Sequence, residues 1–213
     1  MKPYKVPAGE SEIELVEKKS RFIGRIFKVE SPEQAQEIVQ RIKKQHWDAS
    51  HNVYAYVLEN GVMRMSDDGE PQGTAGMPTL EVLKKEEIKN VLCVTTRYFG
   101  GTLLGAGGLT RTYGKTCKQA LDAAGTAVMQ PFDLYHIDCP YGLLETVRRQ
   151  YEGFEADEQG AEFGSSVALS VCLPAGRSEA FCAHLVDKTN GAVRPERRGQ
   201  KLFAKKIREK KGE

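Results

Sequence analysis

The feature that most constrains the fold is a change of hydrophobic pattern near Pro131. Before this point, strand-like and helix-like patterns alternate; after it, the pattern predicts short elements in the order β-α-β-β-α-β. This order is typical of the ferredoxin-like architecture, which is small enough to form a domain of its own. We therefore expect an α+β chain with domains at residues 1–130 and 131–204, a linker at Gln130 and Pro131, and a flexible basic tail at 205–213.

Start signals and apolar runs place the individual elements. Ser31 and Pro32 predict the start of a helix that ends near His46, because Ser is a good N-cap and Pro suits the first helical position. The almost continuous apolar run at 91–96 is typical of a central strand. In the first domain we also expect a hairpin of strands at 12–17 and 21–29, a strand at 53–58, a polar stretch at 59–76, and helices at 78–87 and 109–124. In the second domain we expect strands at 132–139, 156–163, 167–173 and 192–204, and helices at 143–151 and 178–189.

Charge is unevenly distributed, although 31 Lys and Arg residues nearly balance 29 Asp and Glu residues. Residues 192–213 contain nine basic and three acidic residues, whereas residues 131–191 contain four basic and ten acidic residues. A basic end indicates either a polyanionic partner or a solvated tail.

The sequence argues against membrane proteins and disulfide scaffolds. The longest uncharged run, at 163–176, has 14 residues and contains Pro174, whereas a membrane span needs about 20 apolar residues. The N-terminus lacks the apolar core of a signal peptide. Five cysteines without a C-x-x-C pair indicate buried free thiols. We therefore expect a cytoplasmic protein that holds no cofactor.

The segment from Arg97 to Gly114 has six glycines in 18 residues, where average usage predicts about one. No acidic residue occurs from Ile88 to Leu121, and aromatic residues alternate with basic ones, as in surfaces that bind phosphates and stack bases. Glycine-rich loops before helices also favour anions. The alternative is that the glycines only allow close packing of a helix on the sheet. The predicted phosphate-binding residues of this segment are Arg97, Tyr98, Gly100, Gly101, Gly107, Gly108, Arg111 and Lys115.

Two specific nucleotide motifs do not fit this segment. A P-loop requires four residues between its first glycine and the Gly-Lys-Thr sequence, but Gly108 and Gly114 are separated by five. A dinucleotide fingerprint that starts at Gly105 would need a third glycine where this chain has Thr110. The segment therefore indicates a general basic surface and not a defined nucleotide site.

A second candidate site lies in the sequence S-D-D-G-E, which begins at Ser66. Asp67, Asp68 and Glu70 put three carboxylates on one loop, as a hard cation requires, although Asp and Gly are also ordinary turn residues and the calcium-loop pattern does not fit. His51 begins a strand and would form an acid–base pair with Asp67 or Asp68 if the fold brings them together. These four residues define an alternative function as a metal-assisted hydrolase or phosphate-ester enzyme.

Four blocks of sequence resemble the IMPACT family of translation-associated proteins. They are K-S-R-F-I-G at 19–24, A-S-H-N-V-Y-A-Y at 49–56, S-D-D-G-E-P-Q-G-T-A-G-M-P at 66–78 and T-R-Y-F-G-G-T-L-L-G-A-G-G-L at 96–109. The resemblance implies an N-terminal domain with the ribosomal protein S5 domain 2-like fold. In bacterial members it implies a C-terminal ferredoxin-like domain similar to the last domain of elongation factor G.

The resemblance begins near residue 11, so about ten residues of this sequence precede it. Eukaryotic members restrain an amino-acid-starvation kinase largely through an additional N-terminal RWD domain, so we do not expect that role here. We expect a non-enzymatic protein that binds RNA or the ribosome and modulates translation. A further alternative is a protein-interaction module, in which the acidic residues of 131–191 and the aromatic strands form a docking face. The predicted auxiliary electrostatic contacts are Arg197, Arg198, Lys205 and Lys206.

Overall fold

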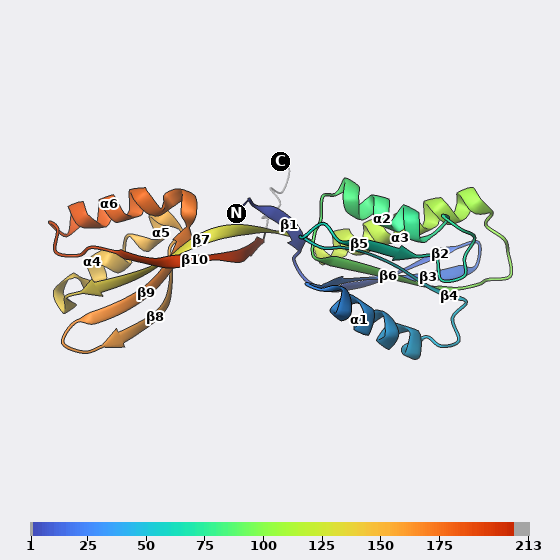
Figure 1. Cartoon of the computed structure of the whole chain (residues 1–213), viewed down its shortest axis with the longest axis horizontal. Helices are drawn as coiled ribbons and strands as arrows, with labels where there is room; N and C mark the ends of the chain where they lie inside the picture. Colours follow the sequence, from blue (N-terminus) through green and yellow to red (C-terminus); the bar gives the residue numbers. More distant parts are fainter. Residues whose placement is uncertain (1, 207–213) are drawn as a thin grey trace. The chain divides into compact units, whose positions relative to one another are not determined.

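The computed structural model describes residues 2–206, and the chain divides into two compact units (Figure 1). The first unit consists mainly of residues 4–128 and the second of residues 129–203. Of the tail expected at 205–213, residues 207–213 lie outside the described residues. Lys205 and Lys206 end strand β10, so this last strand extends beyond its expected end at residue 204.

The first unit contains a five-stranded antiparallel sheet. Its strand order is β2-β3-β6-β4-β5, and the strands are β2 (Ser11–Glu17), β3 (Ser20–Lys28), β6 (Val91–Tyr98), β4 (His51–Val57) and β5 (Met63–Ser66). β6 lies in the centre, and all its residues except the last are buried, which confirms the central strand that its apolar run predicts. The expected hairpin is confirmed by the antiparallel pairing of β2 with β3.

Helices cover both faces of this sheet (Figure 1). α1 (Pro32–Gln45) packs on one face, and α2 (Gly76–Lys85) and α3 (Ala106–Ala124) pack on the other. The predicted start of α1 is confirmed, because Gln34 N donates to Ser31 Oγ at 3.2 Å and Pro32 is its first residue. The apolar side chains of each helix therefore bury a separate layer of core against the same strands.

The second unit follows the predicted order of elements. Its strands are β7 (Thr126–Cys139), β8 (Asp157–Phe163), β9 (Val167–Pro174) and β10 (Glu196–Lys206). β9 pairs antiparallel with both β7 and β8, and β10 pairs with β7. α6 (Ser178–Lys188) buries Phe181 and Leu185 in a core of this unit's own.

The structure corrects four element predictions. Gln130 and Pro131, expected as a linker, lie inside the continuous strand β7. The helix expected at 143–151 is divided into α4 (Leu144–Arg148) and α5 (Tyr151–Phe154). Two short strands were not predicted: β1 (Tyr4–Pro7), which pairs with β7, and β5, which lies in the stretch expected to be irregular.

Both units thus combine helices with antiparallel strand pairs, which confirms the predicted mixture of α and β structure. Among residues 2–206, no helix is long and apolar enough to cross a membrane.

Candidate functional site

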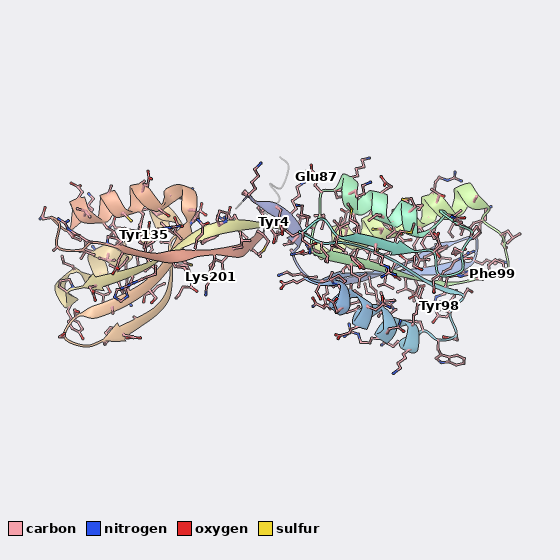
Figure 2. All side chains as sticks on the ribbon, viewed as in Figure 1. Tyr4, Glu87, Tyr98, Phe99, Tyr135 and Lys201 are labelled. Atoms are coloured by element: carbon pink, nitrogen blue, oxygen red, sulfur yellow. The ribbon has the colours of Figure 1, made fainter. Side chains whose placement is uncertain are left out.

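Several loops meet at one end of the first sheet, which we call the loop end. It is formed by the β2–β3 turn and the segments 46–50, 67–75 and 99–105. Two hydrogen bonds join these segments: Phe99 N donates to Ser50 Oγ at 3.2 Å, and Gly100 N donates to Ser20 Oγ at 3.1 Å. Figure 2 shows Phe99 at this end and Glu87 at the opposite end of the same unit.

The β2–β3 turn projects two lysines from the loop end. Lys18 and Lys19 have φ angles of 46° and 67°, the pattern of a type I′ hairpin turn, which Asn and Gly adopt more easily than Lys. The left-handed conformation costs about 1–2 kcal/mol for each such residue. Glycine would adopt this turn without strain. Two exposed lysines in strained conformations therefore indicate a functional role for the turn, because backbone strain is often found at functional sites.

The glycine-rich loop packs directly on that turn. A Cβ atom at Gly100 would lie 2.0 Å from the carbonyl carbon of Lys19 and 2.4 Å from Ser20 N, so only glycine allows the two backbones to approach this closely. Gly101 and Gly105 have φ angles of 80° and 73° and turn the chain into α3. Close packing therefore explains Gly100 by itself, but the packing joins a loop to a turn and not a helix to the sheet.

The glycines at the start of α3 have a different environment. Gly107 and Gly108 belong to the first turn of the helix, where backbone N–H groups lack helical acceptors. A Cβ atom at Gly107 would only touch Arg111 Nη1 at 3.5 Å, whereas one at Gly108 would lie 3.0 Å from Leu104 Cβ. The first turn of α3 contains no acidic residue. No carboxylate of that turn therefore neutralises the positive end of the helix dipole.

A small pocket of about 250 Å³ lies between the β2–β3 turn and the start of α3. We call it the cationic pocket, and it is lined by Glu17, Lys18, Leu104, Gly108, Arg111, Thr112 and Lys115. Lys18, Arg111 and Lys115 are exposed and have no hydrogen-bond or ion-pair partner within residues 2–206. Three cations against one carboxylate give the lining of the pocket a net positive charge, which attracts anions.

Exposed apolar side chains also lie on the segments of the loop end. Trp47, in the segment between α1 and β4, is 83% exposed, Leu103 is 81% exposed and Phe99 is 48% exposed. Side chains of this size are usually buried, so their joint exposure on the segments of one sheet end indicates a binding surface. Exposed aromatic rings and unpaired cations at one end of a domain are the combination that stacks and neutralises single-stranded nucleic acid.

Arg97 was predicted as a phosphate contact, but it is buried. It is 5% exposed, and its Nη1 donates to Glu70 Oε1 at 2.7 Å. Tyr113 Oη donates to the same oxygen at 2.7 Å, and burial together with Glu70 raises the pKa of Tyr113. Arg97 Nε has no hydrogen-bond partner, and its guanidinium lies 5.5 Å from the centre of the Phe99 ring. Arg97 therefore supports the loop end from beneath and does not reach solvent phosphate.

Tyr98, also predicted as a contact, belongs to a polar network on the α1 face of the sheet. Arg25 Nη2 donates to His46 Nε2 at 2.7 Å, so Nδ1 of a neutral His46 carries the hydrogen and donates to Tyr98 Oη at 2.8 Å. Burial and Arg25 lower the pKa of His46, while burial and Asp48 raise the pKa of Tyr98. Tyr98 is held in place and offers only part of its ring to a ligand.

The acidic loop does come close to His51, as the enzyme alternative requires. His51 Nδ1 donates to the backbone oxygen of Asp68 at 2.9 Å, and His51 Nε2 lies 3.8 Å from Glu70 Oε2. The Asp68 carboxylate accepts from Lys43 at 2.5 Å and from Asn52 N at 2.7 Å. These bonds engage both oxygens of Asp68, and the donors Arg97 and Tyr113 both engage Oε1 of Glu70.

Asp67 has a structural task instead. Its carboxylate accepts from the N–H groups of Gly73, Ala75 and Gly76 at 2.9, 3.1 and 2.7 Å, and these groups include the otherwise uncapped start of α2. Within the described part of the chain, no group of three or more His, Cys, Asp or Glu side chains is arranged to hold a metal ion.

Two of the predicted auxiliary contacts near the C-terminus, Arg197 and Arg198, form ion pairs within the chain. Arg197 Nη2 lies 2.7 Å from Asp133 Oδ1, and Arg198 Nη2 lies 2.8 Å from Glu196 Oε2. Although burial raises the pKa of Asp133, the hydrogen bonds from Arg197 and from its other donors lower it overall. Lys205 and Lys206 end β10, and the Lys206 side chain lies outside the description.

The structure brings some of the predicted site residues together and adds others that the sequence did not indicate. Of the predicted residues, Gly108, Arg111 and Lys115 lie together in the cationic pocket. Lys18, Lys19, Trp47 and Leu103 were missed, although a Lys-Lys pair between two alternating strands is a signal of a charged hairpin tip.

Two family models match the chain. The Impact N-terminal domain matches residues 18–121, and a domain of unknown function, DUF1949, matches residues 137–192. The first match includes the entire loop end.

Similar proteins occur in several bacteria. The chain is 40% identical to the IMPACT family member YvyE of Bacillus subtilis, and the match covers 86% of this chain and 85% of the relative. It is 32% identical to YigZ of Escherichia coli, over 91% of this chain and 97% of the relative. A protein IMPACT homolog of Dictyostelium discoideum is 40% identical over 43% of this chain and 28% of its own length.

A solved structure has a similar fold. A crystal structure of a hypothetical protein matches with a TM-score of 0.60 at 31% identity, and the match covers 98% of this chain and 99% of that one.

Proposed function

Because this chain belongs to the IMPACT family, we propose that it is a cytoplasmic, non-enzymatic protein that binds RNA, free or in the ribosome, and thereby modulates translation. The observation that carries the proposal is the cationic pocket, in which Lys18, Arg111 and Lys115 are exposed and have no partner among the residues that the structure describes. The family resemblance motivates the link to translation, and the pocket supplies the chemistry for a polyanion.

The geometry favours single-stranded over double-stranded RNA. In a duplex the bases are stacked on one another, so a protein that offers exposed aromatic rings gains little from them. A single strand offers its base faces, and each base that stacks on an aromatic side chain contributes about 1–3 kcal/mol. Trp47 and Phe99 would stack bases while Lys18, Arg111 and Lys115 neutralise the phosphates, with Lys19 as a further cation.

A salt titration tests the phosphate contacts. A labelled RNA of about twelve mixed nucleotides is a suitable probe for one such surface. In the triple variant Lys18→Ala, Arg111→Ala and Lys115→Ala, we expect affinity at low salt to fall at least about tenfold. The slope of log K against log salt should become shallower by about 2, because each neutralised charge contributes about 0.7 on single strands.

A control with the same net charge separates a local contact from general electrostatics. Lys84→Ala, Lys85→Ala and Lys89→Ala remove three cations around the C-terminal end of α2, on the Glu87 side of the unit and away from Phe99 (Figure 2). We expect these changes to leave the slope almost unaltered. Equal losses in the two triple variants, or no RNA binding by the unaltered protein at low salt, would refute the proposal.

Trp47 provides an optical readout of the same site, because it is the chain's single tryptophan and is 83% exposed. RNA that stacks at the loop end should quench its fluorescence with the same midpoint as the binding curve. RNA that binds without any change in the fluorescence of Trp47 would place the contact elsewhere.

We also propose the finer fold assignments that the resemblance implies: S5 domain 2-like for the first unit and ferredoxin-like for the second. The β-α-β-β-α-β order of the second unit and the pairing of its first strand, β7, with its third, β9, support the latter.

A further inference from the structure

The edge strand β5 leaves backbone hydrogen-bonding groups without a partner. β5 ends the strand order of the first sheet and pairs only with β4. Leu58 N donates to Val62 O at 2.8 Å, and bonded and non-bonded residue pairs alternate along an antiparallel ladder. The N–H and C=O groups of Met63 and Met65 therefore point away from β4, and no backbone bond within residues 2–206 satisfies them.

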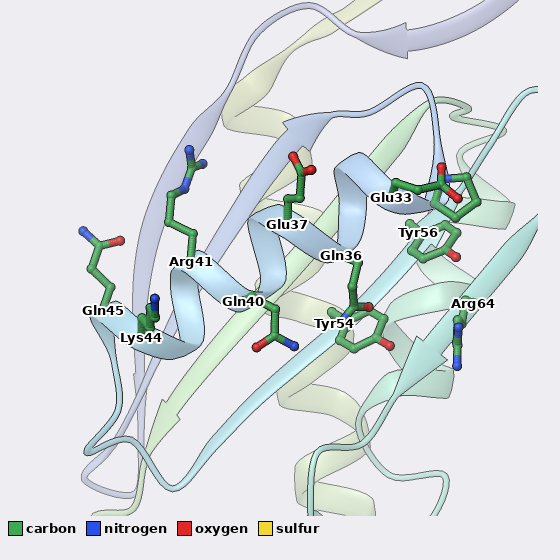
Figure 3. A pocket seen from close by; sticks show the side chains of 11 residues that line it. Glu33, Gln36, Glu37, Gln40, Arg41, Lys44, Gln45, Tyr54, Tyr56 and Arg64 are labelled. Atoms are coloured by element: carbon green, nitrogen blue, oxygen red, sulfur yellow. The ribbon is translucent and has the colours of Figure 1, made fainter.

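A groove of about 1210 Å³ lies beside this edge, on the α1 face of the sheet (Figure 3). The strands contribute Tyr54, Tyr56 and Arg64, and α1 contributes Gln36 and Gln40 on the other side. In the described part of the chain, none of these five side chains has a hydrogen-bond or ion-pair partner. The groove therefore offers hydroxyl, amide and guanidinium groups that are free to bind a ligand.

The opposite face of the same edge is apolar. Met63 lies opposite Val57 in the ladder, on the α2 and α3 side of the sheet, and it is 48% exposed. Met77, in the first turn of α2, is 41% exposed, and a Cβ atom at its neighbour Gly76 would lie 2.9 Å from Met65 Sδ. Exposed methionines of this kind are common at surfaces that bind peptides, because the side chain adapts to different partners.

These features suit a peptide better than a nucleic acid. The outward N–H and C=O groups of Met63 and Met65 match the spacing of another β-strand and not that of a phosphate backbone. Tyr54 and Tyr56 are only 8% and 3% exposed, so their ring faces cannot stack a base. An added strand would place alternate side chains in the groove and on the apolar face.

We propose that an extended segment of a partner protein adds to the sheet beside β5. Its side chains alternate between acidic residues, which face Arg64 in the groove, and apolar residues, which pack on Met63 and Met77. Charge selects the segment, because the groove is lined by three basic residues, Arg41, Lys44 and Arg64, and only two acidic ones, Glu33 and Glu37. Arg64 has no ion-pair partner within residues 2–206, and the backbone bonds provide affinity that does not depend on the exact sequence of the segment. The proposal does not depend on RNA binding at the loop end.

The probe is a synthetic peptide of alternating Glu and Val residues between Gly-Ser ends, compared with the same peptide carrying Lys in place of Glu. We expect the Glu peptide to slow hydrogen exchange at the amides of Met63 and Met65 and to bind at least about tenfold more tightly than the Lys peptide. Amide protection is the decisive readout, because only pairing at the edge satisfies these two groups.

Two variants make the test specific. Met63→Pro removes an outward N–H, which an edge strand tolerates, and should weaken binding of the Glu peptide at least about tenfold while RNA affinity stays unchanged. Arg64→Glu keeps the backbone intact and should reverse the preference between the two peptides, so it decides the question if Met63→Pro fails to fold. As a control, Arg111→Glu should leave peptide binding unaltered.

Three results would overturn the proposal. They are an unchanged affinity for the Glu peptide in a folded Met63→Pro variant, the same peptide preference in Arg64→Glu as in the unaltered protein, and displacement of the peptide by RNA in the Trp47 titration.

Discussion

At the scale of single residues, the loop end depends on one buried ion pair. Glu70 and Arg97 have side chains only 2% and 6% exposed and lie 2.7 Å apart, with Tyr113 as a second donor to the same carboxylate. Loss of one partner leaves the other charge buried and uncompensated, which is far more costly than loss of an exposed pair.

We therefore expect Glu70→Ala to lower the free energy of unfolding by about 3–5 kcal/mol in urea denaturation. The control is Glu81→Ala, which removes an exposed ion pair with Lys84 and should cost less than about 1 kcal/mol. The double variant with Arg97→Met should recover part of the loss, because no buried charge then remains. Similar small effects of Glu70→Ala and Glu81→Ala would show that the pair is not isolated from water.

The same pair explains why sequence alone could not identify the binding cations. Arg97 and Arg111 look equivalent in a basic, glycine-rich segment. They differ because Arg97 belongs to the central strand and meets Glu70 from a distant loop, whereas Arg111 lies on the exposed side of α3. Composition predicts that a segment is basic, but tertiary contacts determine which of its basic side chains form ion pairs within the protein and which remain exposed to solvent.

At the scale of elements, the join between the glycine-rich loop and the β2–β3 turn permits only one residue type. Gly100→Ala would place a methyl group 2.0 Å from the backbone of Lys19, so one of the two loops has to move. We expect a loss of stability above about 2 kcal/mol, measured by thermal unfolding, together with weaker RNA binding.

Gly107→Ala is the matched control for that change. It lies in the first turn of α3, where the new methyl group meets only the flexible end of Arg111 at 3.5 Å. Because alanine favours helix over glycine by about 1 kcal/mol, the variant should be as stable as the unaltered protein or slightly more so. A stability loss at Gly107 as large as that at Gly100 would contradict the packing argument.

Elements with a strong local signal were predictable, and those defined by distant partners were not. The Ser31 cap and the apolar run of β6 specify their elements within a few residues of chain. β5 has four residues, none of them buried, and it is a strand because β4 supplies its hydrogen bonds. β-propensity depends on such neighbours, so the missed strand and the groove beside it could not be read from local sequence.

At the scale of the whole molecule, each unit has a core of its own. Phe181 and Phe22 are both fully buried, the first in the core of the second unit and the second in that of the first. Truncation of a buried phenylalanine to alanine costs about 3–5 kcal/mol.

We expect Phe181→Ala to speed amide hydrogen exchange throughout the second unit and to leave the exchange of α3 and β6 in the first unit unchanged. Phe22→Ala should produce the opposite pattern. If either variant speeds exchange equally in both units, the chain unfolds as one cooperative block and the two cores are not energetically separate.

Strand β7 runs unbroken from Thr126 to Cys139, and the division between the two units falls inside it. Genetic recombination exchanges protein segments most easily when the crossover lies in a surface loop, where the ends of the chain carry few backbone bonds. Here a crossover at the division would cut a strand and leave its N–H and C=O groups unpaired in both products. A division of the chain at this point would therefore cost backbone hydrogen bonds that a division in a surface loop would not.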